Sequence, residues 1–205
     1  MQARPVSNYG ESKLEGEIEL LRFAHQFPIS IVRPPPVYGP RDQGVFIFIK
    51  MVSEGLMPVI HGQTPDKNKF MSIVHVDDLC QGIIKAGLVT KEQCPSGEVF
   101  YICSDEVVSL AEILETVQQH LGNRVIRLPV PRSLLRLSAV VADQITKTTG
   151  RPLSLSSDKV NELLQDYWIC SNQKAKEKLG FEPQVSLDQG MKETIEWYKD
   201  HGWIR

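Results

Sequence analysis

Four prolines fall within seven residues, at positions 34, 35, 36 and 40, directly after the β-branched run Ile29–Val32. A short run of this kind predicts a buried strand. Proline breaks a helix and has no N–H group to donate to a neighbouring strand. Residues 33–40 are therefore expected to form neither a helix nor a central strand. The segment is therefore predicted to be a stiff loop that leaves the carboxyl end of the strand.

Hydrophobic spacing along the rest of the chain alternates between helical and strand periods. Ser109 and Glu112 form a capping box before a helix that Gly122 ends, and Asp77 or Asp78 stands where a helix N-cap belongs. Strands followed by helices predict an α/β chain with parallel strands and a small mixed lobe in the second half. Helices are expected over 9–25, 45–54, 77–86, 109–121, 131–145, 156–166, 172–179 and 187–199, and strands over 29–32, 57–61, 72–76, 98–103 and 124–128.

Charge and cysteine usage narrow the function classes. The 205 residues carry 23 Lys and Arg against 25 Asp and Glu, a net charge of −2, which argues against a nucleic-acid partner. No apolar run approaches the ~20 residues of a membrane span, and no secretory leader is recognisable at Met1. The four cysteines lack metal-ligand spacing, so we expect no metal site and reduced thiols in a cytoplasmic protein.

Tyr9 and Lys13 are the candidate catalytic residues, and they stand four positions apart in a predicted helix. Residues four apart on a helix lie on one face, one turn from each other. An ammonium group near a phenol favours the phenolate, and a tyrosine tuned in this way can act as a general acid/base. The alternative interpretation is an ordinary solvated helix face, because this spacing also occurs by chance.

The stretch Ser7–Lys13 resembles the active-site motif of the extended short-chain dehydrogenase/reductase family, which includes the NAD-dependent sugar epimerases and dehydratases. Residues 33–40 look like the strand-end loop of that family, and His75–Leu79 is similar to its later strand-to-helix turn. Leu179–Pro183 and Trp197-Tyr198 resemble its helical ending. The four pieces follow the order of the family and span essentially the whole chain.

The resemblance implies a role for each matching residue. Tyr9 would be the general acid/base, and Lys13 would tune it and bind the nicotinamide ribose. Pro34 and Val37 would line the nicotinamide site of an NAD or NADP cofactor. Tyr38 and Gly39 would begin the substrate loop, although such a turn can also be purely structural. We expect His75 to be a packed histidine, and Asp77 and Asp78 to serve as helix cap and turn stabiliser.

The first half of the family's pattern has no counterpart in this sequence. The chain contains no Gly-x-x-Gly-x-x-Gly turn, which holds the cofactor pyrophosphate at a helix N-terminus. Residues 1–205 are therefore expected to form the C-terminal portion of an NAD(P)-binding Rossmann-fold domain, merged with the substrate-binding lobe. Alone, this portion should bind the dinucleotide weakly, expose a sheet edge beside Ile29–Val32 and tend to associate. A homodimer is a further implication of the resemblance.

The substrate class remains open between two branches of the family. Met71-Ser72-Ile73 stands where nucleotide-sugar enzymes commonly carry an arginine, and Gly55–Pro58 looks more like the 3β-hydroxysteroid dehydrogenase-like branch. Hydride transfer at a secondary alcohol or ketone is favoured, with Met57, Ile60 and Met71 as an apolar lining or as ordinary core. The alternatives are a nucleotide-sugar epimerase or dehydratase, and a truncated non-catalytic relative or interaction module.

Overall fold

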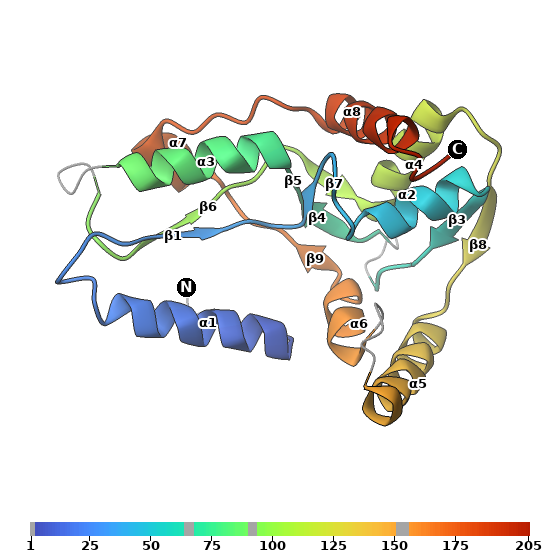
Figure 1. Cartoon of the computed structure of the whole chain (residues 1–205), viewed down its shortest axis with the longest axis horizontal. Helices are drawn as coiled ribbons and strands as arrows, with labels where there is room; N and C mark the ends of the chain where they lie inside the picture. Colours follow the sequence, from blue (N-terminus) through green and yellow to red (C-terminus); the bar gives the residue numbers. More distant parts are fainter. Residues whose placement is uncertain (1–2, 64–67, 90–93, 151–155) are drawn as a thin grey trace.

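The computed structural model describes residues 3–63, 68–89, 94–150 and 156–205. Helices and short strands alternate along the chain, as the hydrophobic spacing predicts (Figure 1). The helices are α1 (Asn8–Leu21), α2 (Phe46–Ser53), α3 (Val76–Leu88), α4 (Leu110–Leu121), α5 (Arg132–Thr149), α6 (Ser157–Leu163), α7 (Gln173–Leu179) and α8 (Leu187–Asp200). The strands are β1 (Ser30–Arg33), β2 (Val37–Tyr38), β3 (Leu56–Val59), β4 (Phe70–Ser72), β5 (Val74–His75), β6 (Glu98–Tyr101), β7 (Val107–Ser109), β8 (Ile126–Pro129) and β9 (Tyr167–Trp168).

Most strand pairs are parallel, which confirms the expected sheet type. β1 pairs with β6, β2 with β5 and β3 with β8, each in parallel register. β4 lies between β9, which is parallel to it, and β7, which is antiparallel. Within the described part of the chain β1 has β6 as its one neighbour, so its second edge is open. The open sheet edge predicted beside Ile29–Val32 is thus present among the described residues.

Three local predictions need correction. The proline-rich segment is not loop throughout, because Val37 and Tyr38 keep their N–H groups and form β2 against β5. The strand predicted over 72–76 is divided between β4 and β5, which pair with different strands. The short strands β7 and β9 were not predicted. Strands of two or three residues depend on their partners rather than on a local pattern.

Helix ends follow local signals where those signals exist. The Ser109 hydroxyl accepts from the Glu112 amide, and the Glu112 carboxylate accepts from the Ser109 amide, which confirms the capping box of α4. Gly122 ends this helix with φ 67°, a left-handed conformation that favours glycine. The first helix ends at Leu21, earlier than the predicted His25, and residues 22–26 form turns.

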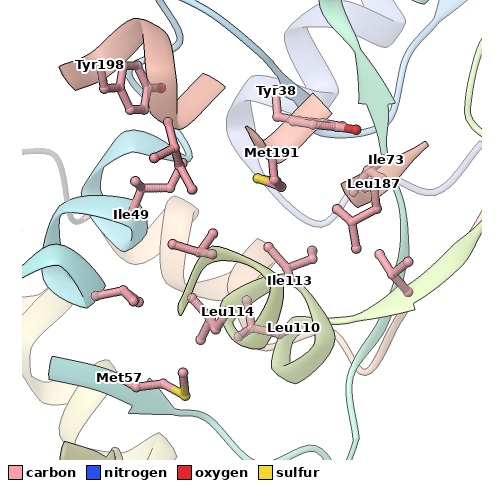
Figure 2. Close-up of a cluster of buried hydrophobic side chains, with 14 of the residues drawn as sticks. Tyr38, Ile49, Met57, Ile73, Leu110, Ile113, Leu114, Leu187, Met191 and Tyr198 are labelled. Atoms are coloured by element: carbon pink, nitrogen blue, oxygen red, sulfur yellow. The ribbon is translucent and has the colours of Figure 1, made fainter. Parts of the chain in front are cut away.

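The larger core cluster lies between α2, α4 and α8, with β3 beneath them (Figure 2). Tyr198 of α8 is fully buried there, and its hydroxyl donates to the Asp42 carbonyl at 2.7 Å. The C-terminal helix therefore docks on its own chain. A second cluster joins α3, β6 and α7 around Phe100, Ile102 and Phe181. Among the described residues no helix is both long enough and apolar enough to cross a membrane.

Candidate active site

The helix α1 begins in a turn that is fixed against α6. Ser7 is its N-cap: the hydroxyl accepts from the Gly10 amide at 3.1 Å and donates to the Glu162 carboxylate at 2.6 Å. Asn8 adds two contacts to the Asp158 carboxylate, from its amide N–H at 2.9 Å and its side chain at 3.1 Å. The end of the helix that carries the Tyr-Lys pair is therefore held by hydrogen bonds to a segment 150 residues away.

Tyr9 and Lys13 lie together on an outward face of α1. The Lys13 Nζ stands over the Tyr9 ring, 5.3 Å from its centroid. Tyr9 is 64% exposed and Lys13 is also exposed, so both polar ends can meet a ligand. The expected pairing on one helix face is confirmed. The chemical role assigned to the pair stays a prediction.

Hydrogen bonds connect the face of α1 that carries Tyr9 and Lys13 to the carboxyl end of β1. Glu17, one turn beyond Lys13, accepts from Arg33 Nε at 2.9 Å and also from its terminal nitrogen. The Arg33 guanidinium donates in addition to the Tyr101 hydroxyl at 3.2 Å. The hydrogen bonds that Arg33 donates to Glu17 raise the pKa of Arg33 above its ordinary value. These positioning residues were missed in the sequence, although Glu17 stands at the helical spacing that continues Tyr9 and Lys13.

Pro34 and Val37 bracket the segment that leaves β1. Pro34 follows Arg33 directly and is exposed, whereas Val37 is half-buried and packs on the second core cluster. Because Arg33 contacts Glu17, this strand end lies beside the helix that carries Tyr9 and Lys13. The cofactor contacts proposed for Pro34 and Val37 stay predictions.

Tyr38 and Gly39 occupy a different environment from Tyr9. Tyr38 is 3% exposed, part of the larger core (Figure 2), and its hydroxyl faces the Ser186 carbonyl at 3.4 Å. Burial raises the pKa of this phenol above its ordinary value. Gly39 has φ 143°, and a Cβ there would lie 2.6 Å from a Val76 methyl carbon. The Tyr38 side chain is therefore part of the core, because α8 covers it. At Tyr38 and Gly39 only the backbone is left to contact a substrate.

The turn into α3 differs from the prediction in its cap. His75, not an aspartate, is the N-cap residue, and its Nδ1 accepts from the Asp77 amide at 3.4 Å. Asp78 is the expected turn stabiliser: its two carboxylate oxygens accept from the amides of Gln184 at 2.9 Å and Val185 at 3.1 Å. His75 is buried against the edge of the Tyr38 ring, as a packed histidine should be.

Two other features lie away from the Tyr9–Lys13 pair. His75, Asp77 and Glu193 place one potential metal-ligand atom each within 4.8 Å of the others, a grouping that spacing could not reveal because Glu193 belongs to α8. A pocket of about 240 Å³ between β3 and α4 is lined by Met57, Ile60 and Lys69 among others. Met57 and Ile60 are also core residues, while Met71 is half-buried in β4.

Comparison with curated proteins identifies relatives along nearly all of the chain. It is 28% identical over 208 residues to the protein named ceramide reductase from Caulobacter vibrioides, covering 97% of this chain and 59% of that protein. It is 24% identical over 213 residues to short-chain dehydrogenase/reductase family 42E member 1 of Danio rerio, covering 95% and 53%. The chain therefore spans about half the length of the curated relatives that it matches.

Solved structures reproduce the same fold. The UDP-glucuronic acid 4-epimerase of Bacillus cereus, solved with UDP-glucuronic acid and NAD, superposes with a TM-score of 0.72 at 22% identity. The match covers 98% of this chain and 55% of the epimerase. At this identity the similarity establishes the Rossmann-type α/β fold and nothing finer.

The profile of the NAD dependent epimerase/dehydratase family matches residues 1–103, half of the chain. The matched part contains the α1 pair, the proline-rich segment and the turn into α3. The chain belongs to the NAD-dependent epimerase/dehydratase family, within the wider class of short-chain dehydrogenase/reductase proteins.

Proposed function

We propose that this chain is the proton-transfer and substrate-side portion of an NAD(P)-dependent oxidoreductase that acts on a secondary alcohol or ketone. The observation that carries the proposal is the contact of the Lys13 ammonium with the Tyr9 ring on an exposed, anchored helix face. Family membership makes this pair a candidate for catalysis rather than a chance surface pair.

Tyr9 would transfer the proton at the substrate oxygen. During ketone reduction its hydroxyl gives a proton to that oxygen, and during alcohol oxidation its phenolate takes one. The Lys13 charge, 5.3 Å from the ring centroid, stabilises the negative charge that develops on the Tyr9 oxygen. The Ser7 cap and the Glu17–Arg33 contact hold the helix in place, so both groups keep their positions through the reaction.

A nicotinamide dinucleotide, when bound, supplies or accepts the hydride. The chain fits the nicotinamide end of such a cofactor, because Lys13 and Pro34 are exposed next to the end of β1. The pyrophosphate end has no fitting residues here, since the sequence lacks a glycine-rich turn. We therefore assign residues 1–205 to the C-terminal portion of the cofactor domain merged with the substrate lobe. NAD and NADP remain equally compatible with these residues.

An uncharged substrate is favoured by the surroundings of Met71. This residue stands where the nucleotide-sugar enzymes commonly have an arginine, and it pairs with Val108 and Trp168 in the middle of a sheet. Position 71 therefore has no positively charged side chain that could bind the diphosphate of a nucleotide sugar. The relative named ceramide reductase supports the same preference by its name.

The second candidate is a nucleotide-sugar epimerase or dehydratase. A relative from Escherichia coli O157:H7, 23% identical over 198 residues, is named as the 4-epimerase of an N-acetylglucosaminyl-diphospho-undecaprenol. That substrate is a sugar diphosphate on a lipid, so the name supports sugar epimerisation and not the nucleotide. Both candidates require Tyr9 and Lys13, so they differ in the substrate and not in the proton-transfer pair.

The test is a Tyr9→Phe substitution in the longest form of the protein that its gene encodes. Turnover of long-chain ketones and of UDP-sugars is measured with NAD(H) and NADP(H). We expect kcat to fall by about 10²–10⁴-fold with little change in dinucleotide affinity, because general acid/base catalysis contributes on that order. The substrate that is turned over by the parent protein decides between the two candidates.

Tyr167→Phe is the matched control, since Tyr167 is 61% exposed and lies in β9. It should leave kcat unchanged. If both variants behave like the parent protein, Tyr9 is not the acid/base. If the parent protein turns over neither substrate class and binds neither dinucleotide, the non-catalytic relative or interaction module replaces the enzyme.

A further inference from the structure

Two cysteines that lie 67 residues apart in the sequence are in contact in the structure. Cys103 follows β6, and Cys170 follows β9. The Cys103 Sγ donates to the Cys170 carbonyl oxygen at 3.7 Å. Cys103 is 1% exposed, whereas Cys170 is half-buried, so Cys170 is the more accessible residue of the pair.

The backbone around the two thiols is held by other contacts. The Ser72 hydroxyl accepts from the Cys170 amide at 3.1 Å and lies 3.2 Å from its carbonyl oxygen. The Asn172 side chain donates to the Cys103 carbonyl at 2.8 Å and to the Asp105 carboxylate at 2.7 Å. These bonds keep the segments after β6 and β9 side by side whether or not the sulfurs are joined.

The two thiols also differ in acidity. The neighbouring Cys103 thiol lowers the pKa of Cys170 to about 7, against the opposing effect of burial. The neighbouring Cys170 side chain, together with burial, raises the pKa of Cys103 above its ordinary value. Cys170 is therefore the nucleophile of the pair, since the thiolate and not the thiol reacts.

We propose that Cys170 and Cys103 form an oxidation site for hydroperoxides, with Cys170 as the attacking thiol and Cys103 as the resolving thiol. The Cys170 thiolate attacks the O–O bond, takes one oxygen as sulfenic acid, and the other oxygen leaves as water or an alcohol after it gains a proton. The Cys103 sulfur then attacks the Cys170 sulfur, the S–O bond breaks, and the departing hydroxide takes the Cys103 proton to form water. Two thiols are oxidised to one disulfide, and the hydroperoxide is reduced by two electrons.

The other two cysteines lack this arrangement. Cys80 is exposed on α3, and Cys94 is buried with its pKa raised by desolvation. They serve as internal controls. If solvent exposure alone decided which thiol is oxidised, Cys80 would react first. If burial alone prevented oxidation, Cys94 and Cys103 would both stay reduced.

The unmutated 205-residue chain is treated with one equivalent of hydrogen peroxide and examined by intact mass and peptide mapping. We expect the loss of two hydrogens and a reducible peptide pair that contains Cys103 and Cys170. The rate should rise with pH through about 7 as Cys170 ionises. A mass gain of oxygen without that linked pair, or a linkage through Cys80 between two molecules, would overturn the proposal.

Two variants separate the assigned roles. In Cys103→Ala the sulfenic acid on Cys170 should persist and react with dimedone, because its resolving partner is absent. Cys80→Ala should form the 103–170 disulfide as fast as the parent chain. Dimedone labelling of Cys80 in place of Cys170 would contradict the assignment, and circular dichroism of each variant confirms that it is folded.

Discussion

At the scale of single residues, Gly190 decides how closely α8 approaches the buried Tyr38. A Cβ at position 190 would lie 2.6 Å from the Tyr38 hydroxyl oxygen and 3.0 Å from His75 Cδ2. Contacts this short force a shift of a packed ring. The absence of a side chain at this position therefore allows the helix, the Tyr38 ring and the His75 ring to pack together.

We expect Gly190→Ala to lower the free energy of unfolding by about 1–3 kcal/mol, as overpacking of a core typically does. Gly16→Ala is the matched control in another helix, because a Cβ at Gly16 meets no atom within 4 Å. The control should be neutral or stabilising by up to about 1 kcal/mol, since alanine favours helix. Thermal and urea unfolding measure both variants. A Gly190→Ala chain as stable as the parent would mean that α8 can move away from Tyr38 without loss.

At the scale of elements, α1 is the least embedded helix of the site. It buries no residue, and it exposes Ile18, Leu20 and Leu21. Its position rests on the Ser7 and Asn8 contacts at one end and on the Glu17–Arg33 pair further along. The helix that carries the candidate acid/base is thus held by polar tethers rather than by a hydrophobic face.

Glu17→Gln should loosen this helix. The substitution removes the charge that the half-buried Arg33 pairs with, and a hydrogen bond to a charged group contributes roughly 1.5–3 kcal/mol. We expect the α1 amides to exchange with deuterium about tenfold faster or more, while α8 keeps its protection. Glu15→Gln, on an exposed position of the same helix, should change nothing. Equal exchange in both variants would show that the Glu17–Arg33 pair does not hold α1.

At the scale of the whole molecule, the described structure has an open strand edge and exposed apolar side chains. The second edge of β1 has no partner among the described residues, and apolar side chains of α1 are exposed. Open strand edges and exposed apolar faces favour association with other chains.

The 205-residue chain alone should bind NAD(H) and NADP(H) weakly or not at all and should associate as its concentration rises. The reason is that its sequence supplies no phosphate-binding turn, while the open β1 edge invites pairing. Calorimetry with each dinucleotide and sedimentation velocity over a range of concentrations measure these two properties. Micromolar dinucleotide affinity would contradict the assignment of this chain to the C-terminal portion of the domain.

The predictions that succeeded rest on local chemistry. The capping box of Ser109 and Glu112, the stop at Gly122 and the shared face of Tyr9 and Lys13 all arise within a few residues. The predictions that failed involve distant partners. His75 caps α3 in place of an aspartate, and the turn that Asp78 stabilises lies at residues 184–185, far from it in the sequence.

The sequence by itself determined the α/β class, the helix that presents Tyr9 and Lys13, and the family resemblance, because helical spacing and motif order are properties of neighbouring residues. Only the tertiary structure decided that Tyr38 is core, that Glu17 and Arg33 anchor the site helix, and that Cys103 meets Cys170. Each of those contacts joins residues from separate elements. Their proximity depends on the path of the whole chain, which packing of the helices against the strands determines.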